Sequence, residues 1–103
     1  MSLPEDIAVE IVAVMQAVMR RDLDSALRHH ENALKLTRFA ILTVDVEVAS
    51  RELQDKPFGP LLSMQIMYRD VEKCLLDQRA DIERLAIVIA AISAGHAGVV
   101  GKA

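Results

Sequence analysis

The stretch of sequence that decides the fold runs from Leu61 to Val99 and reads LLSMQIMYRDVEKCLLDQRADIERLAIVIAAISAGHAGV. Its mostly apolar positions recur at alternating spacings of three and four, which is the heptad pattern of a helix packed against another helix. The positions of this heptad seam are Leu61, Met64, Tyr68, Val71, Leu75, Gln78, Ile82, Leu85, Ile89, Ile92, His96 and Val99. The nine charged residues from Arg69 to Arg84 all fall outside the seam. The pattern therefore predicts one long amphipathic helix that has a partner.

Composition narrows the fold class. The chain has 103 residues, enough for a single core, and 52% of them are hydrophobic. Only 3% are aromatic and Trp is absent, so the core must be built from aliphatic side chains and Met, which is typical of helix-on-helix packing. The four glycines and three prolines are too few for the many turns of an all-β sandwich. We therefore expect one all-α domain.

The sequence predicts three helices, at about residues 4–20, 24–54 and 60–94, followed by a tail at 95–103. Residues 55–60, DKPFGP, contain two prolines and a glycine and predict a helix–helix connection. Because short connections join antiparallel neighbours, the second and third helices should form a long hairpin with the first helix packed across it. We expect dimerisation to complete the bundle.

The first helix carries its start signals in the sequence Ser2-Leu3-Pro4-Glu5, with Ser as N-cap and Glu three residues later. Two adjacent apolar stripes then cover more than half of its circumference, which is the pattern of a helix that touches two neighbours. The stripes consist of Ile7, Ile11, Val14 and Val18, and of Ala8, Val12, Met15 and Met19. A cap for the second helix is available at Asp22 or Asp24.

Residues 39–49, FAILTVDVEVA, fit two periodicities. Read with period two, the segment is a credible strand rich in β-branched residues. Read with a helical period, it shows two stripes, one of Thr37, Ile41, Val44 and Val48 and one of Leu42, Val46, Ala49 and Leu53. A lone strand would need the same strand of another copy as its partner, because the chain has no second strand-like run. We therefore favour a continuous helix.

Residues 21–36, RDLDSALRHHENALKL, resemble the second helix of a tetratricopeptide repeat. The small and apolar packing positions of that motif are filled by Ala26, Ala33, Leu34 and Leu36. The preceding helix lacks the motif's aromatic and glycine positions, and no second copy follows at the period of about 34 residues. The resemblance implies the packing of a helical hairpin and a weak bias toward protein–protein interaction.

A polar line runs along the second helix at heptad spacing and consists of Glu31, Arg38, Asp45 and Glu52. Buried charges are tolerated only when paired, so either this line is open to water or Arg38 pairs with an acid beside it. A functional alternative makes Arg38, Asp45 and Glu52 the polar network of a small bundle enzyme or of a ligand or metal binder. Di-metal bundles carry Glu-x-x-His on each of two helices, and this sequence has no such motif. We expect neither a metal nor a cofactor.

The end of the third helix is the most unusual segment. No formal charge occurs from Leu85 to Gly101, and residues 85–92, LAIVIAAI, are apolar on every face. A helix of this kind is buried in protein or in a membrane, and the segment is marginal in length for a bilayer span, so membrane contact is the less favoured alternative. Two other helices cannot cover this end, so we expect another chain to meet it. The predicted interface residues are Val71, Leu75, Ile82, Leu85, Ile89 and Ile92.

Charge and cysteine content exclude some functions. The formal net charge is −3, with no basic face and no stacking aromatics, which disfavours nucleic-acid binding. The single cysteine, Cys74, cannot form an intramolecular disulfide and is expected as a small buried hydrophobe. The acidic first residues are unlike a signal peptide, so a cytoplasmic location is expected.

The sequence lacks the usual enzyme motifs: a Gly-rich phosphate loop, Cys-x-x-Cys, His-Glu-x-x-His and Gly-x-Ser-x-Gly. Since His29 and His30 project about a hundred degrees apart on a helix, they cannot hold one metal. We expect His29 in solvent, His30 semi-buried and His96 in the tail. The sequence thus predicts a non-catalytic interaction module, an adaptor, chaperone or assembly subunit, whose partner is a second copy or another helical protein.

Overall fold

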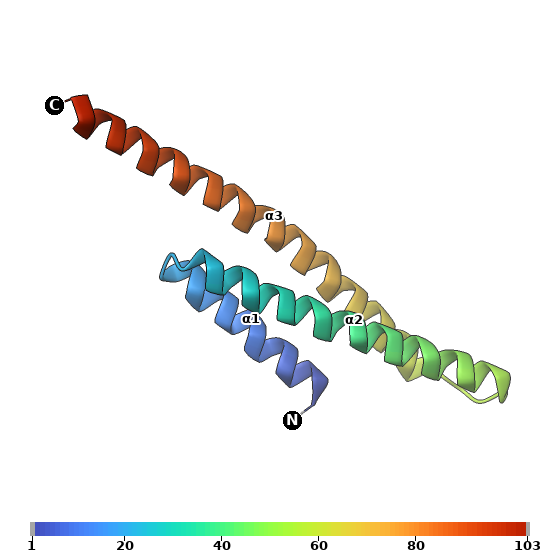
Figure 1. Ribbon diagram of the computed structural model, residues 1–103. Helices are drawn as coiled ribbons and strands as arrows, with labels where there is room; N and C mark the ends of the chain where they lie inside the picture. The colour runs from blue at the N-terminus through green and yellow to red at the C-terminus, as the bar shows by residue number, and fades with distance from the viewer. Residues whose placement is uncertain (1, 103) are drawn as a thin grey trace.

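The computed structural model describes the backbone of residues 2–102 and the side chains of residues 2–95. It contains the helices α1 (Leu3–Met19), α2 (Leu23–Leu53) and α3 (Gly59–Lys102), and no strand in the described part (Figure 1). The all-α prediction is confirmed, and residues 39–49 are helical. The predicted helix end near residue 94 is wrong, because α3 continues through residues 95–102. A glycine costs a helix about 1 kcal/mol but does not end it, so Gly95 is accommodated. The side chain of His96, predicted to lie in a tail, is outside the described residues.

The N-termini of α1 and α2 are capped by side chains. The hydroxyl of Ser2 accepts a hydrogen bond from the backbone N–H of Glu5 at 3.4 Å, as the sequence predicted. Of the two candidate caps for α2, Asp22 is the one used, and its carboxylate accepts from the N–H of Ser25 at 3.2 Å. The hydrogen bonds from Ser25 hold the pKa of Asp22 below its ordinary value of 3.8.

Both α1 and α2 end in a left-handed residue that is not glycine. After α1, Arg21 has φ 59°, its N–H donates to the carbonyl of Val18, and the next N–H, of Asp22, donates to that of Ala17, both at 2.9 Å. This is the Schellman arrangement, which turns the chain sharply and satisfies the last carbonyls of the helix. The same arrangement ends α2, where Asp55 has φ 54°.

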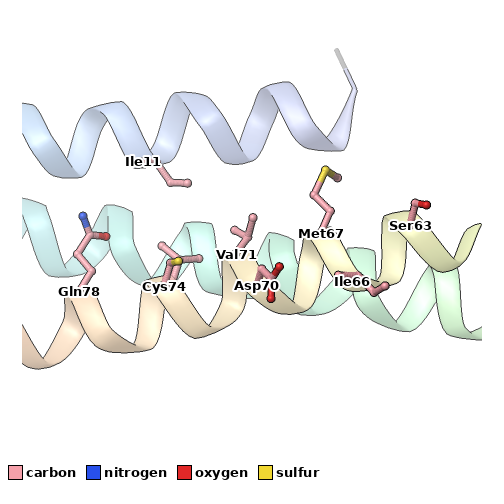
Figure 2. A pocket seen from close by; sticks show the side chains of 9 residues that line it. Ile11, Ser63, Ile66, Met67, Asp70, Val71, Cys74 and Gln78 are labelled. Carbon is pink, nitrogen blue, oxygen red and sulfur yellow. The ribbon is translucent and has the colours of Figure 1, made fainter.

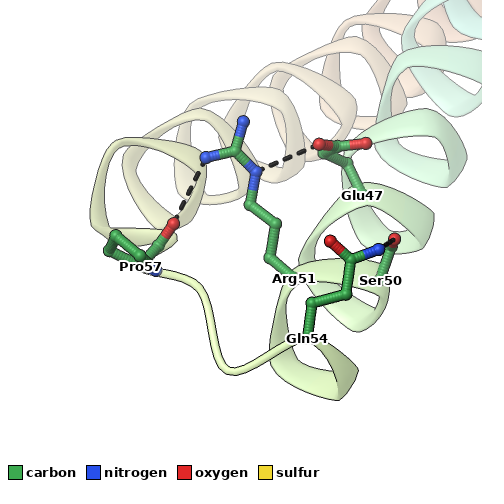
Figure 3. Close-up of polar contacts among 5 residues, drawn as sticks. All are labelled: Glu47, Ser50, Arg51, Gln54 and Pro57. Carbon is green, nitrogen blue, oxygen red and sulfur yellow. Dashed lines mark hydrogen bonds and ion pairs between the residues drawn. The ribbon is translucent and has the colours of Figure 1, made fainter.

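The connection between α2 and α3 is held by side chains of the last α2 turns (Figure 3). The guanidinium of Arg51 donates to the carboxylate of Glu47 at 3.0 Å and to the carbonyl of Pro57 at 3.2 Å. The amide of Gln54 donates to the hydroxyl of Ser50 at 3.4 Å. The bond from Arg51 to Pro57 fastens the proline-containing loop to the helix before it.

The three helices form an incomplete bundle with α2 as the central helix. α2 packs against both α1 and α3, whereas α1 and α3 have little contact with each other. α1 and α3 run in the same direction and α2 runs against both (Figure 1). The Cα atoms extend over 75 × 22 × 14 Å, with a radius of gyration of 19.4 Å. A globular chain of this length has a radius of gyration of about 13 Å, so the molecule is flat and elongated.

The core lies on the two sides of α2 and is built largely from small aliphatic residues. One cluster joins all three helices near the N-terminus of α1 and consists of Ile7, Ala40, Val44, Val48 and Tyr68. A second, at the opposite end of α1, consists of Val14, Ala17, Ala26 and Ile82. Between them lie Ala33, Leu34 and Leu75. The alanines let the helix backbones approach closely, which explains how the three helices pack together with so few large side chains.

Two polar side chains are fully buried in this core, His30 and Thr37. The hydroxyl of Thr37 donates to the carbonyl of Ala33 at 2.8 Å, inside its own helix. The Nε2–H of His30 donates to the carbonyl of Leu75 on α3, because a carbonyl oxygen can only accept. His30 was predicted to be semi-buried; it is fully buried because α3 covers it.

Candidate functional site

An open groove lies between α1 and α3, with α2 behind it (Figure 2). Ile11 of α1 points into the groove from one wall, and Met67 and Val71 of α3 point into it from the other (Figure 2). Its volume is about 600 Å³, and its lining is completed by Ser63, Ile66, Asp70, Cys74, Leu75 and Gln78. The groove exists because α1 and α3 each pack on α2 and do not close on each other. The groove lies at the position that the fourth helix would occupy in a four-helix bundle.

The groove continues along almost the whole of α1. Toward the start of α1 it passes into a hollow of about 220 Å³ that shares Ile11, Met67 and Val71. Toward the end of α1 it passes into one of about 310 Å³ lined by Met15, Val18, Met19, Gln78, Asp81, Ile82 and Leu85. A last hollow, about 420 Å³, lies between the α1–α2 turn and the region of α3 from Leu85 to Ser93. The shared residues show that these hollows form one continuous apolar surface.

Three members of the second apolar stripe of α1, Ala8, Met15 and Met19, line this surface, and Val12 lines a separate hollow on α1. Of the stripe's members, Val12, Met15 and Met19 are exposed, with Met15 at 55%. α1 packs mainly against α2 and meets α3 at Tyr68 and Ile82, deep in the core. The exposed residues of the second stripe are not covered by either helix.

The predicted interface residues divide into two groups. Leu75 and Ile82 are buried by α2 within the same chain, at 3% and 4% exposure, and Val71 is half-buried in the core. Within the single chain these three residues belong to the core or its edge, and their contact with a second chain stays a prediction. Farther along α3, Leu85 and Ile89 are half-buried and Ile92 is 65% exposed. The change occurs where α2 begins, since its residue Ala26 already packs on Ile82.

The side of α2 that faces away from the core carries another exposed apolar surface, which we call the outer stripe. Its members follow the three-and-four spacing of a heptad seam and are Phe39, Leu42, Val46, Ala49 and Leu53. Val46, at its centre, is 61% exposed. Four of the five form a stripe that the sequence had already indicated. The molecule thus presents apolar surface on two opposite sides.

Residues of the polar line on α2 form separate pairs with residues of α3. Arg38 donates to Glu72 at 3.1 Å, and Asp45 pairs with Arg69 at 3.3 Å and accepts from the amide of Gln65 at 2.7 Å. Of the two alternatives for this line, both describe Arg38, which is largely exposed and pairs with Glu72 of α3. The predicted single network of Arg38, Asp45 and Glu52 is not formed, because successive members along the helix reach different partners and Glu52 is exposed. Within the described residues no three His, Cys, Asp or Glu side chains lie close enough to hold a metal ion.

Two further side chains depart from expectation. His29, predicted in solvent, is partly buried and lies 2.7 Å from the carboxylate of Glu10 on α1. Cys74, predicted as a buried hydrophobe, is exposed in the groove. Both differences follow from the lateral placement of α1, which comes near His29 on one side of α2 and stops short of Cys74 on α3.

Among the described residues no helix is apolar over a sufficient length to cross a bilayer. The chain matches no family model, and it has no significant match among the curated proteins or the solved structures with which it was compared.

Proposed function

We propose that this chain is a non-catalytic, self-associating protein–protein interaction module that acts as an adaptor, chaperone or assembly subunit. The observation that carries the proposal is the amount of exposed surface. The chain exposes 7219 Å². A compact monomer of the same mass exposes about 5,800 Å², so the excess is roughly 1,400 Å². A standard protein–protein interface buries about 800 Å² on each partner, so the excess is large enough for a stable association.

The chemistry of the excess surface supports the same proposal. The exposed residues include Met15, Met19, Met67 and Ile92 around the groove and Val46 on the outer stripe. Contiguous apolar surface of more than a few hundred Å² is unusual on a monomer and marks sites of interaction. Methionine side chains are flexible and adapt to the shape of a helix that packs on them.

The two opposite apolar sides support the role of an adaptor or assembly subunit. Self-association through the groove would leave the outer stripe open to a helix of another protein. The alternative of an enzyme or a ligand or metal binder is less well supported, because Arg38 and Asp45 are engaged in partly exposed ion pairs with Glu72 and Arg69.

The proposal is tested by the mass in solution of two matched variants, measured by light scattering after size exclusion. Ile92→Asp places a charge on the uncovered end of α3, and Asn32→Asp adds the same charge to an exposed polar position on α2. We expect the first to reduce the mass to that of one chain, 11.4 kDa, and the second to leave the mass of the native protein unchanged. Equal circular dichroism spectra would show that both variants fold. An unchanged mass for Ile92→Asp would remove the main support for self-association through this end.

A further inference from the structure

We infer, on the basis of the proposed self-association, that the groove is filled by the C-terminal part of α3 from a second copy. The exchange is reciprocal, so each chain provides three helices of one bundle and the fourth helix of the other. Four observations on the single chain lead to this arrangement: helix direction, length, the phase of the heptad seam and surface area.

Helix direction selects α3 of a second copy. In an up-down four-helix bundle, neighbouring helices are antiparallel. α1 and α3 run in the same direction, so a helix between them must run in the direction of α2 (Figure 1). A twofold axis perpendicular to α3 places a second α3 antiparallel to the first. The second copy thereby supplies a helix of the required direction beside α3.

The lengths agree. α3 continues from Ile82, the last of its residues buried by α2, to Lys102. These 20 residues (102 − 82) measure about 30 Å. The groove follows α3 from Ser63 to Leu85, which is about 33 Å. The part of α3 beyond Ile82 is therefore about as long as the groove.

The heptad seam has the phase that the exchange requires. Up to Ile82 the seam faces α2 of the same chain. A twofold axis perpendicular to α3 places α1 of the partner against the C-terminal part of α3. It lies there on the same side of α3 that α2 of the same chain contacts in the N-terminal part. The seam therefore keeps facing a bundle core beyond Ile82, now that of the partner, through Leu85, Ile89 and Ile92. This explains a seam that is longer than any helix of its own chain can cover.

The chemistry and the area of the exposed surface also agree with this exchange. The occupant is uncharged from Leu85 to Gly101 and enters a groove whose lining is largely apolar, with the polar side chains of Ser63, Asp70 and Gln78 along it. The second stripe of α1 receives the second neighbour that its width predicts. Each chain covers the partner's groove and has its own α3 end covered, which accounts for the excess of roughly 1,400 Å² derived from the size of the chain.

The structure also locates the twofold axis. α2 covers α3 as far as Ile82, and a hollow separates the α1–α2 turn from Leu85, Val88 and Ile92. We place the crossing of the two α3 helices in this last region, where α2 no longer covers α3. Cys74 lies about 12 residues before the crossing, or about 18 Å, so the two copies of Cys74 are about 36 Å apart. A disulfide needs Cα atoms within about 7 Å, so Cys74 cannot pair with its own copy.

Single-cysteine cross-linking of the full chain tests the arrangement. In a Cys74→Ser background, cysteine is placed in turn at Leu85, Val88 and Ile92, which line the crossing, and at Val46, on the outer stripe. Val88 and Val46 form a matched pair, because both are valines on helices and are 51% and 61% exposed. We expect mild oxidation to link at least one of the crossing variants into a disulfide dimer at least tenfold faster than Val46→Cys. The native chain, with Cys74 alone, should remain unlinked.

Each other outcome overturns the inference. Faster linkage of Val46→Cys would assign the interface to the outer stripe, and linkage of the native chain through Cys74 would place the axis in the groove. A dimeric mass without linkage at any crossing position would show that the α3 ends are not paired. In these three cases self-association stands and the exchange fails. A mass of one chain for the native protein and the Cys74→Ser background, measured alongside, would refute both.

Discussion

His30 holds α2 to α3 mainly by filling space, and its replacement tests how the core is built. The side chain is fully buried, and its Nε2–H donates to the carbonyl of Leu75. His30→Ala removes the five ring atoms and leaves a cavity, for which core truncations cost about 2 to 5 kcal/mol. The lost hydrogen bond adds about 1 kcal/mol, and removal of the partnerless buried Nδ1 returns a similar amount. We expect a loss of about 3 kcal/mol in the free energy of unfolding.

His30→Leu is the matched variant, because leucine has a similar volume and neither ring nitrogen. It should cost less than about 1 kcal/mol. The assay is urea unfolding followed by circular dichroism, at one protein concentration because association adds to apparent stability. With a urea dependence of about 1.5 kcal/mol per molar, His30→Ala should lower the midpoint by about 2 M. A loss as large for His30→Leu would show that the hydrogen bond dominates, and a loss below about 1 kcal/mol for His30→Ala would refute the burial of His30.

Three further predictions concern the turns and the polar line. Arg21→Gly should raise stability by about 0.5 to 1 kcal/mol, because glycine adopts the left-handed conformation without steric cost; a loss would contradict the described turn. Asp45→Asn should cost about 0.5 to 1 kcal/mol, and Glu52→Gln nothing measurable, in urea unfolding; equal effects would contradict the separate pairs of the polar line. Because its pKa is lowered in the folded state, Asp22 stabilises the protein above pH 3.8 and loses this contribution as the pH falls through the lowered value. The stability of Asp22→Asn, which keeps a cap, should therefore approach that of the native chain between pH 5 and pH 2.

Most of the fold could be predicted from local patterns. The heptad seam, the cap at Ser2 and the prolines of residues 55–60 identify the helices and their connection because these signals act within a few residues. The ambiguous residues 39–49 were resolved by a non-local argument, the lack of a second strand. The end of α3 was missed, since Gly95 weakens a helix without ending it.

The candidate site could be predicted only in part. The sequence shows that α1 has two apolar stripes and that the end of α3 is apolar, but it does not show which stripe α2 covers. That choice depends on the lateral placement of α1, which also decides the surroundings of His29 and Cys74. The sequence also does not show that Leu75 and Ile82 are buried within the single chain, because a seam has the same pattern whether its partner is in the same chain or in another.

The mass of the native protein in solution tests the central claim most directly. Light scattering after size exclusion at micromolar concentration should give at least twice the 11.4 kDa of the chain, because about 1,400 Å² of excess surface would be covered by a second copy. A mass of 11.4 kDa that persists as the concentration rises to several hundred micromolar would contradict the claim, since the apolar groove and the end of α3 would then remain open to water.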